Sequence, residues 1–394
     1  MISVAEALRQ ITDLFSPLDV EYIPLRHASG RVLAKNVTAE RAQPPFAASA
    51  MDGYAVIDAD IGKTQHLTVV GEAAAGKRFR GTITPGQAVR IFTGSPVPLG
   101  ADRIIIQEDV TREGDQITIC EDPDRGPHIR ASGDDFDTGA EVTAPRRLTP
   151  SDVALLASMN QATLPVYRKP VVALIATGDE LVMPGGLPNE DQIIASNNFG
   201  LAALLERRGA ECRMLPIARD TPDSLKMALK LCEGADLIVT IGGASVGDYD
   251  IVRDVALELG MHPAFYKVAM RPGKPLMAGR MGKTPIIGLP GNPVSSMVCG
   301  HIFIHPALNV MQGLGAQALT RNLAQLGSDL PENGSREHYM RAKIGFEYSR
   351  LTVHPFERQD SALLSVLSSA NGLLVRPPFD PAKKAGDLVE IIQF

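Results

Sequence analysis

The segment 236-DLIVTIGGASVGDYDIVRDVALELG-260 joins an apolar run, a glycine-rich turn and an amphipathic run. The apolar run at 236–241 predicts a buried strand, and the amphipathic run at 250–260 predicts a helix. Glycine-rich turns between a strand and a helix usually approach a phosphate group, because their N–H groups point at the ligand. This turn also holds Asp248 and Asp250, and carboxylates repel phosphate. A divalent cation between the acids and the phosphate would remove that conflict, so the segment predicts metal–phosphate chemistry.

The alternation of strand and helix continues on both sides of this segment, from about residue 171 to 313. The predicted strands are apolar, which is typical of a parallel sheet covered by helices on both faces. Open sheets of this kind bind ligands at the carboxyl ends of their strands, where the glycine-rich turn lies. The predicted strands are 171–176, 212–217, 236–241, 264–270 and 284–289, and the predicted helices are 198–209, 221–232, 250–260 and one from about Asn292.

The length and texture of the chain predict several domains. Its 394 residues are too many for one hydrophobic core and suggest about two to four domains. Short alternating runs split by Gly, Pro and Asp indicate a β-rich module, and the helical segments on either side of it indicate an insertion. The predicted units are a mixed N-terminal unit of 1–44 plus 141–168, the β-rich inserted unit 45–140, an α/β unit 169–318 and a small C-terminal β-unit 319–394.

The composition disfavours several classes of protein. The net charge is −6 and aromatic residues make up 5% of the chain, with no tryptophan. Nucleic-acid binding normally needs a basic surface and stacking side chains, so we expect none here. The N-terminus lacks the basic region of a signal peptide, and no apolar run approaches the roughly 18 residues of a membrane span. The four scattered cysteines, with no CxxC pair, indicate reduced thiols and a cytoplasmic protein.

Acidic side chains follow several strands of the predicted sheet. Glu180 lies in 176-ATGDEL-181, Asp220 follows the strand 212–217, and both Asp248 and Asp250 lie in the glycine-rich turn. Because parallel strands end at one edge of a sheet, we expect these carboxylates to converge. The ordinary alternative is that each carboxylate caps the next helix and interacts favourably with its dipole. Two acids in one glycine-rich turn are harder to explain as caps, which favours a Mg²⁺ site.

Two further loops carry groups that suit an anion. The stretch 290-PGNPVSS-296 places Asn292 as N-cap and Pro293 at the first helical position, which is a good helix start in any case. The same arrangement binds anions where the helix N-terminus is open. The loop 267-KVAMRPGKP-275 is threaded with prolines and apolar residues, so we interpret its cations as ligands for a polyanion rather than as a solvated face. These cations are Lys267, Arg271 and Lys274.

The remaining polar residues give weaker signals. Asp52 in 49-SAMDGYAV-56 and Thr93 in 92-FTGSPVPLGAD-102 both lie beside glycines, and turn chemistry is the ordinary explanation for both. His301 and His305 are one helical turn apart beside Ile and Phe residues. They lack the glutamate of the HExxH motif, so we predict packing rather than metal binding.

Taken together, these motifs resemble those of the MoeA family of molybdopterin molybdenumtransferases and of the homologous E domain of gephyrin. The segments follow the family's order across nearly the whole chain, and the ordered set is far more specific than any one of them. They are SAMDGYAV (49–56), RIFTGSPVPLGAD (90–102), GDD (133–135) followed by TGA, IATGDEL (175–181), RDTPDSL (219–225), GGASVGDYD (242–250), RPGKP (271–275) and GLPGNPVSS (288–296).

The resemblance implies an enzyme whose substrates are adenylylated molybdopterin and molybdate. With Mg²⁺ it would cleave the adenylyl bond and release AMP and molybdenum cofactor. The implied fold is an elongated four-domain subunit with a parallel α/β domain that holds the pterin nucleotide. The subunit would form a homodimer with the active site between subunits. The molybdopterin adenylyltransferase and the molybdoenzyme acceptors are the implied protein partners.

The resemblance also implies roles for single residues. The metal ligands would be Glu180, Asp220 and Asp250. The catalytic set would be Asp52, Glu180, Asp220, Asp250, Lys267 and Arg271. The ligand-binding set would be Thr93, Arg130, Asp135, Gly242, Gly243, Ser245, Gly247, Lys274, Pro290, Pro293, Arg341 and Ser361, of which Arg341 and Ser361 match the family less closely.

Arg271 stands where some family members have lysine, so an electrostatic role is retained but a proton-donor role is not implied. The segment 129-IRASGDD-135 lacks the run of arginines that some members show. Two other functions stay open. A molybdopterin adenylyltransferase shares the α/β domain but is usually much shorter, and a gephyrin-like scaffold would bind a partner peptide without needing the acids. For the enzyme, we expect Asp250→Asn to abolish Mg²⁺-dependent turnover and to leave the fold intact, and near-normal AMP release by that variant would contradict this.

Overall fold

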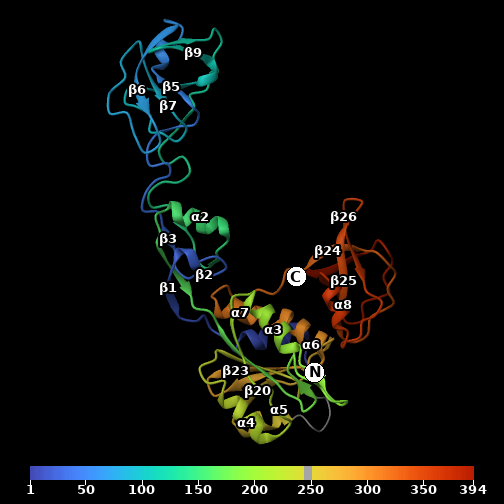
Figure 1. Cartoon of the computed structure of the whole chain (residues 1–394). Helices are drawn as coiled ribbons and strands as arrows, with labels where there is room; N and C mark the ends of the chain where they lie inside the picture. The colour runs from blue at the N-terminus through green and yellow to red at the C-terminus, as the bar shows by residue number, and fades with distance from the viewer. Residues whose placement is uncertain (244–250) are drawn as a thin grey trace.

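The structure is a computed structural model that describes residues 1–243 and 251–394. The chain is elongated, with a β-rich unit at one end and an α/β unit beside a C-terminal β-unit at the other (Figure 1). A small mixed unit connects the β-rich unit to the α/β unit. This multidomain architecture confirms the predicted fold class. The residue numbers at which the units divide stay a prediction.

The α/β unit is built on a six-stranded sheet of order β18-β15-β19-β23-β22-β20. The first four strands pair in parallel, as predicted, whereas β22 and β20 form an antiparallel edge. The predicted strand 264–270 is wrong in extent, because β20 ends at Phe265 and residues 270–271 pair with the C-terminal sheet instead. The strand bounds are β15 Val171–Ala176, β18 Glu211–Met214, β19 Leu237–Ile241, β20 Met261–Phe265, β22 Met277–Met281 and β23 Thr284–Leu289.

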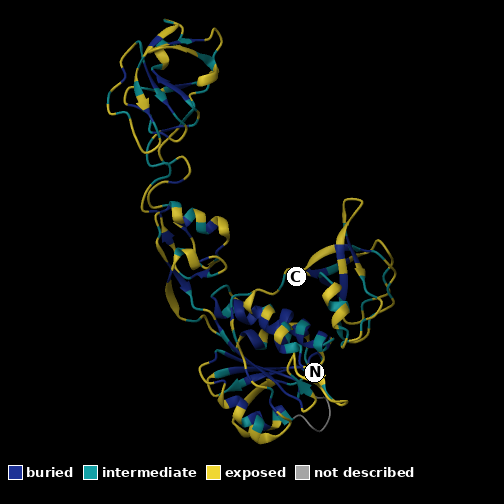
Figure 2. Cartoon of the chain, viewed as in Figure 1, coloured by how far each residue is buried: buried dark blue, intermediate teal, exposed yellow. Residues whose placement is uncertain are grey.

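Helices cover both faces of this sheet, so its central strands are buried throughout (Figure 2). In β15, Val172 and Leu174 pack on one face with helices α1, α3, α6 and α7. Ala173 and Ile175 pack on the opposite face with α4 and α5. The helix bounds are α1 Val4–Thr12, α3 Asn197–Glu206, α4 Pro222–Lys230, α5 Ile251–Glu258, α6 Pro293–Cys299 and α7 His305–Met311.

The N-terminal helix α1 belongs to the α/β unit by its contacts. Val4, Ala7 and Ile11 form one buried stripe that packs in the same core as α7. The predicted grouping of residues 1–44 in the mixed N-terminal unit stays a prediction, and α1 contacts the core of the α/β unit. The helical stripe was visible in the sequence, but the surface against which it packs comes from residues nearly 300 positions away.

The other three units consist mainly of short strands. The mixed unit contains β1 Val20–Pro24, η1 Leu25–His27, β2 Val32–Leu33, β3 Val37–Thr38, β12 Glu141–Val142, β13 Arg146–Arg147, α2 Pro150–Ser158 and β14 Thr163–Tyr167. The β-rich unit contains β4 Ala48–Ser49, β5 Gly53–Val56, η2 Asp58–Asp60, β6 His66–Ala73, β7 Gln87–Ile91, β8 Arg103–Ile106, η3 Gln107–Asp109, β9 Val110–Glu113, β10 Gln116–Ile119 and β11 Ile129–Arg130. The C-terminal sheet contains β21 Met270–Arg271, β24 Asn322–Leu326, β25 Glu337–Glu347, β26 Arg350–Pro355, β27 Gly372–Arg376 and β28 Leu388–Gln393, with helix α8 Leu364–Ser369.

Helix α6, the π-helical segment η4 (Gly300–Ile304) and α7 form one continuous helix from Pro293 to Met311. By length and composition alone this helix could cross a membrane, which the sequence analysis did not anticipate. Within the protein, 89% of its apolar window is buried, as in the core helix of a globular unit.

His301 and His305 on this helix pack in the core, as predicted. His301 stacks on Phe394 with ring centroids 4.4 Å apart. Burial, reinforced by the nearby Arg208, lowers the pKa of each histidine to about 4. Both rings are therefore neutral in the folded protein at neutral pH.

The two histidines make the α/β unit sensitive to acid. The unfolded chain takes up a proton near the ordinary histidine pKa of about 6.5, and the folded chain does not until about pH 4. Stability is therefore lost as pH falls between these values, by about 2 kcal/mol per histidine between pH 7 and pH 5. Urea unfolding at the two pH values should show this loss. His305→Gln should reduce it, whereas replacing the exposed His27 should not, and an unchanged loss in His305→Gln would contradict the assignment.

Candidate active site

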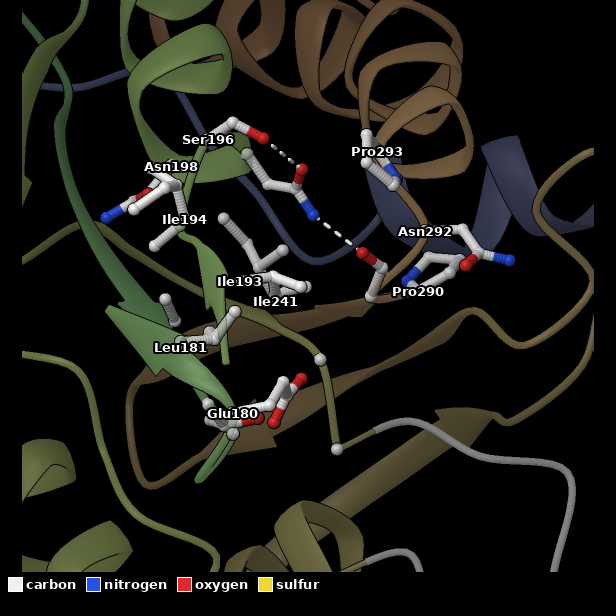
Figure 3. A pocket seen from close by; sticks show the side chains of 18 of the residues that line it. Glu180, Leu181, Ile193, Ile194, Ser196, Asn198, Ile241, Pro290, Asn292 and Pro293 are labelled. Atoms are coloured by element: carbon white, nitrogen blue, oxygen red, sulfur yellow. Dashed lines mark hydrogen bonds between the residues drawn. The ribbon is translucent and has the colours of Figure 1, made fainter. Parts of the chain in front are cut away.

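A cavity of about 600 Å³ opens at the carboxyl end of the parallel strands. The loops after β15, β18, β19 and β23 all contribute to it, as the sequence analysis expected of a ligand site in this fold. Asn292 and Ala362 also reach it, the latter from the C-terminal unit. We call it the rim cavity, because it lies at the carboxyl rim of the sheet. Figure 3 shows Leu181, Ile193 and Ile241 between Glu180 at one end of the rim cavity and Ser196 at the other.

Two of the predicted acids meet in the rim cavity. Glu180 follows β15 and Asp220 follows β18, and both line the cavity. The glycine at 178 has a φ of 148°, and a Cβ there would lie 2.3 Å from a Glu180 carboxylate oxygen. Only glycine at this position lets the Glu180 carboxylate lie against the backbone.

The acids leave an excess of negative charge in the cavity. Burial, followed by the charges of Asp179 and Glu180, raises the pKa of Asp220. Arg219 lies 3.8 Å from Asp179. Within residues 1–243 and 251–394, this is the one ion pair that the loop makes. Carboxylate oxygens facing a phosphate site are suitable ligands for Mg²⁺. In the described part of the chain no three acids, histidines or cysteines are close enough to hold a metal together. The third predicted metal ligand, Asp250, lies outside the described residues.

The start of the glycine-rich turn has the geometry that requires glycine. Gly242 and Gly243 line the cavity with φ values of 96° and 65°. A Cβ on Gly242 would lie 2.5 Å from the carbonyl oxygen of Thr177, and one on Gly243 would lie 2.3 Å from Val252. The positive φ values and this close packing together require glycine at both positions. The predicted residues Ser245, Gly247, Asp248 and Asp250 lie outside the described residues.

The C-terminal unit closes one side of the cavity. Asn292 is at the N-cap position of α6, but its side-chain amide donates to Ser361 Oγ at 2.9 Å instead of capping the helix. The Ser361 carbonyl in turn accepts from the N–H of Val294 at 3.0 Å. Pro290 and Pro293 line the cavity beside this link. Ser361 thus caps a helix of another unit.

Arg341 holds the segment that carries Ser361 in place. Its side chain is fully buried and donates to the carbonyls of Asp360 at 2.9 Å and Arg358 at 3.3 Å. The Gln359 amide accepts from the Arg341 N–H and donates to its carbonyl. In this structure Arg341 therefore contacts the loop that carries Ser361, and ligand contact by Arg341 stays a prediction. No motif in the sequence points to Gln359.

The loop 267–275, which we call the basic loop, lies next to the cavity and is held by backbone hydrogen bonds on two sides. Its backbone bonds to Ile2 on one side, and β21 pairs with β25 of the C-terminal sheet on the other. Pro275, which follows Lys274, lines the cavity, whereas the cations themselves are not among its lining residues. In the described part of the chain, Lys267, Arg271 and Lys274 make no ion pair, and Lys267 and Arg271 are exposed.

The predicted residues of the β-rich unit form a separate group. Asp52 accepts hydrogen bonds from the N–H and the hydroxyl of Thr93, both at 2.7 Å, and these bonds lower the pKa of Asp52. Arg130 lies on β11, and Asp135 follows it. Figure 1 places the β-rich unit at the far end of the chain from the rim cavity. One chain therefore does not bring Asp52 and Thr93 together with Glu180 and Asp220.

Several cavity residues carry no signal in the sequence. Ile193 and Ile194 come from a short strand in a loop rich in Gly and Pro. The side-chain amide of Asn197 donates to the carbonyl of Gly291 at 2.7 Å and thereby fixes the turn that precedes α6. The neighbouring Asn198 is 1% exposed, and its amide has no hydrogen-bond partner within the described residues. An alignment of distant relatives is the signal that could have identified these positions.

Comparisons with known proteins agree with this architecture. Residues 2–160 match the family model of the MoeA N-terminal region (domain I and II), 173–310 that of a probable molybdopterin binding domain, and 324–394 that of the MoeA C-terminal region (domain IV). A molybdopterin molybdenumtransferase of Nostoc sp. is 33% identical over 97% of this chain and 91% of its own length. Molybdopterin molybdenumtransferase 2 of Mycobacterium tuberculosis is 36% identical over 96% of each chain. The crystal structure of the molybdopterin biosynthesis MoeA protein from Pyrococcus horikoshii OT3 superposes with a TM-score of 0.83 at 28% identity, covering 100% of both chains. This chain belongs to the MoeA family.

Proposed function

We propose that this protein is a molybdopterin molybdenumtransferase. It takes adenylylated molybdopterin and molybdate and releases AMP and molybdenum cofactor. Relatives that match nearly the whole chain carry this name. The observation that carries the proposal is the rim cavity, which is lined both by Glu180 and Asp220 and by the glycine turn at Gly242 and Gly243. Acids beside a phosphate-type turn fit a phosphoanhydride substrate that is bound together with a cation.

The residues of the cavity fit Mg²⁺. Oxygen donors are present, and the pKa of Asp220 is raised by burial and, to a smaller extent, by the charges of Asp179 and Glu180, which a cation would offset. When bound, Mg²⁺ would withdraw charge from the phosphate oxygens during cleavage of the bond to AMP. Glu180 and Asp220 would hold the ion, with Asp250 as a further ligand. The turn at Gly242 would bind the phosphate through backbone N–H groups.

The basic loop and the C-terminal segment would bind the oxyanions. Lys267, Arg271 and Lys274 supply charge that suits molybdate and phosphate alike. Ser361 lies beside Pro293 through its bonds to Asn292 and Val294, so its hydroxyl lies near the cavity. Arg341 supports that segment, and a charge this close also favours an anion there. Positioning and charge neutralisation of this kind, without a covalent nucleophile, are what phosphoryl chemistry requires.

The active protein would be a homodimer. Asp52 and Thr93 form a preorganised pair that is remote from the cavity of their own chain. In a twofold-symmetric dimer the β-rich unit of one subunit can reach the cavity of the other. Asp52, Thr93, Arg130 and Asp135 of the partner subunit would then complete the site. We further propose that the enzyme is cytoplasmic and exchanges its substrate and product with an adenylyltransferase and with molybdoenzyme acceptors.

The proposal is tested by incubating the protein with adenylylated molybdopterin, molybdate and Mg²⁺ and measuring AMP by chromatography. The expected result is one AMP per pterin consumed, with a product that activates a molybdenum-free apoenzyme. A second reaction contains molybdopterin and ATP without molybdate. Adenylylation in that reaction would favour the adenylyltransferase. Nucleotide binding without turnover in either reaction would favour a scaffold.

A further inference from the structure

Arg90, on β7 of the β-rich unit, is held in one position by four contacts. Its guanidinium carbon lies 5.2 Å from the centroid of the Tyr54 ring and 4.7 Å from that of the Phe92 ring. Its two terminal nitrogens donate to the carbonyl of Gly53 at 3.1 Å and to the side-chain oxygen of Gln107 at 2.8 Å. A lysine could keep the charge, but it could not stack on two rings and bridge two acceptors at once.

The two hydrogen bonds of Arg90 end on both sides of Asp52. Gly53 directly follows Asp52 in the chain. The N–H of Gln107 donates to the carbonyl of Asp52 at 3.0 Å. Arg90 therefore joins the end of β7 to the start of β5 and to η3, and Asp52 lies where these three segments meet.

The bonds of Asp52 show why its position matters. Both bonds from Thr93 end on the same oxygen, Oδ1, at 2.7 Å. Within the described residues the other oxygen, Oδ2, accepts no hydrogen bond, so it is the oxygen left for a substrate. Thr93 directly follows Phe92, over whose ring Arg90 lies. The bonds from Thr93 and, to a smaller extent, the charge of Arg90 lower the pKa of Asp52.

We propose that Arg90 is a positioning residue for the reaction, which holds Asp52 and Thr93 in the arrangement that the cavity of the partner subunit requires. This inference rests on the proposed function, in which the pair acts on that cavity. In the described part of the chain Arg90 makes no ion pair, so no counter-charge accounts for its place. The ordinary alternative is that Arg90 only stabilises the β-rich unit. The two roles differ in whether the effect of Arg90 depends on Asp52.

The test is a double-mutant cycle in which kcat and KM for AMP release are measured on Arg90→Lys, Asp52→Asn and the combined variant. Arg90→Lys should lower kcat by about tenfold or more and leave KM unchanged, because the charge stays but the fork and the stacking are lost. In the Asp52→Asn background the same change should have no further effect, since nothing is left to position. Arg103→Lys is the matched control. It lies on β8 of the same sheet, bonded to Asp58 at 2.7 Å, and should release AMP as wild type does.

Amide hydrogen exchange at Thr93 gives a second measurement that does not need turnover. The Thr93 N–H is bonded to Asp52, so it should exchange faster in Arg90→Lys than in wild type or Arg103→Lys. Wild-type kcat or wild-type exchange in Arg90→Lys would overturn the positioning role, and so would a full further loss of kcat when Arg90→Lys is added to Asp52→Asn. A wild-type protein that releases no AMP disproves the proposed function, and the exchange rates then still decide whether Arg90 holds the pair.

Discussion

Replacing Asp220 by asparagine should lower the Mg²⁺-dependent release of AMP by about a thousandfold or more. Asp220 and Glu180 are the described acids that line the cavity beside the glycine turn. Asparagine keeps the shape of the side chain but removes the charge that binds the cation. Single-turnover AMP release at saturating substrate measures the effect, and Glu180→Gln should act in the same direction.

The thermal stability of Asp220→Asn shows whether its loss of AMP release comes from the site alone or from unfolding. Because the fold raises the pKa of Asp220, its charged form is disfavoured in the folded state, and stability decreases as pH rises from the ordinary carboxyl pKa through the raised one. Without Mg²⁺ at neutral pH, Asp220→Asn should therefore melt at the same temperature as wild type or slightly higher. Mg²⁺ should raise the melting temperature of wild type only. Asp223→Asn, in the first turn of α4, is the matched control and should behave as wild type. Normal AMP release by Asp220→Asn would contradict the assignment of the metal site.

A heterodimer of one Asp52→Asn subunit and one Asp220→Asn subunit should regain about half of the wild-type activity. Asp52 lies far from the cavity of its own chain, so the account has it act on the partner's cavity. One site of this heterodimer then carries both changes and the other carries none. Co-expression with two different affinity tags yields the mixed dimer, and AMP release is measured on it. Each variant alone should be nearly inactive.

A second heterodimer serves as the control for this experiment. Glu180→Gln paired with Asp220→Asn places both changes in the α/β unit, so each site keeps one lesion and should stay inactive. If the Asp52→Asn and Asp220→Asn heterodimer is no more active than its parents, Asp52 acts within its own chain or the site is not shared. A monomeric protein with full activity would also contradict the shared site.

Much of the α/β unit could be predicted from local patterns. β15 and β19 are apolar over their whole length because helices cover both faces, and that composition is readable without a structure. The acids Glu180 and Asp220 were placed correctly at one cavity, since parallel strands must end at one edge. Gly242 and Gly243 are predictable as a turn because glycines follow an apolar strand and precede a helix, and their φ values bear this out.

The features that were missed depend on distant partners. Residues 264–270 have the composition of one strand, but Met270 and Arg271 pair with Glu337 and His338 in another unit. The stripe of α1 gives no indication that it packs beside α7. Ile193 and Ile194 are in a loop by composition, and only the pairing with β16 (Leu181–Val182) turns them toward the cavity.

The most direct test of the account is a crystal of the protein soaked with adenylylated molybdopterin, Mg²⁺ and molybdate. The account predicts a metal ion at about 2.0–2.1 Å from oxygens of Glu180 or Asp220. A phosphate is expected at the turn of Gly242. A ligand bound outside the rim cavity, or bound there with no metal at either acid, would contradict it.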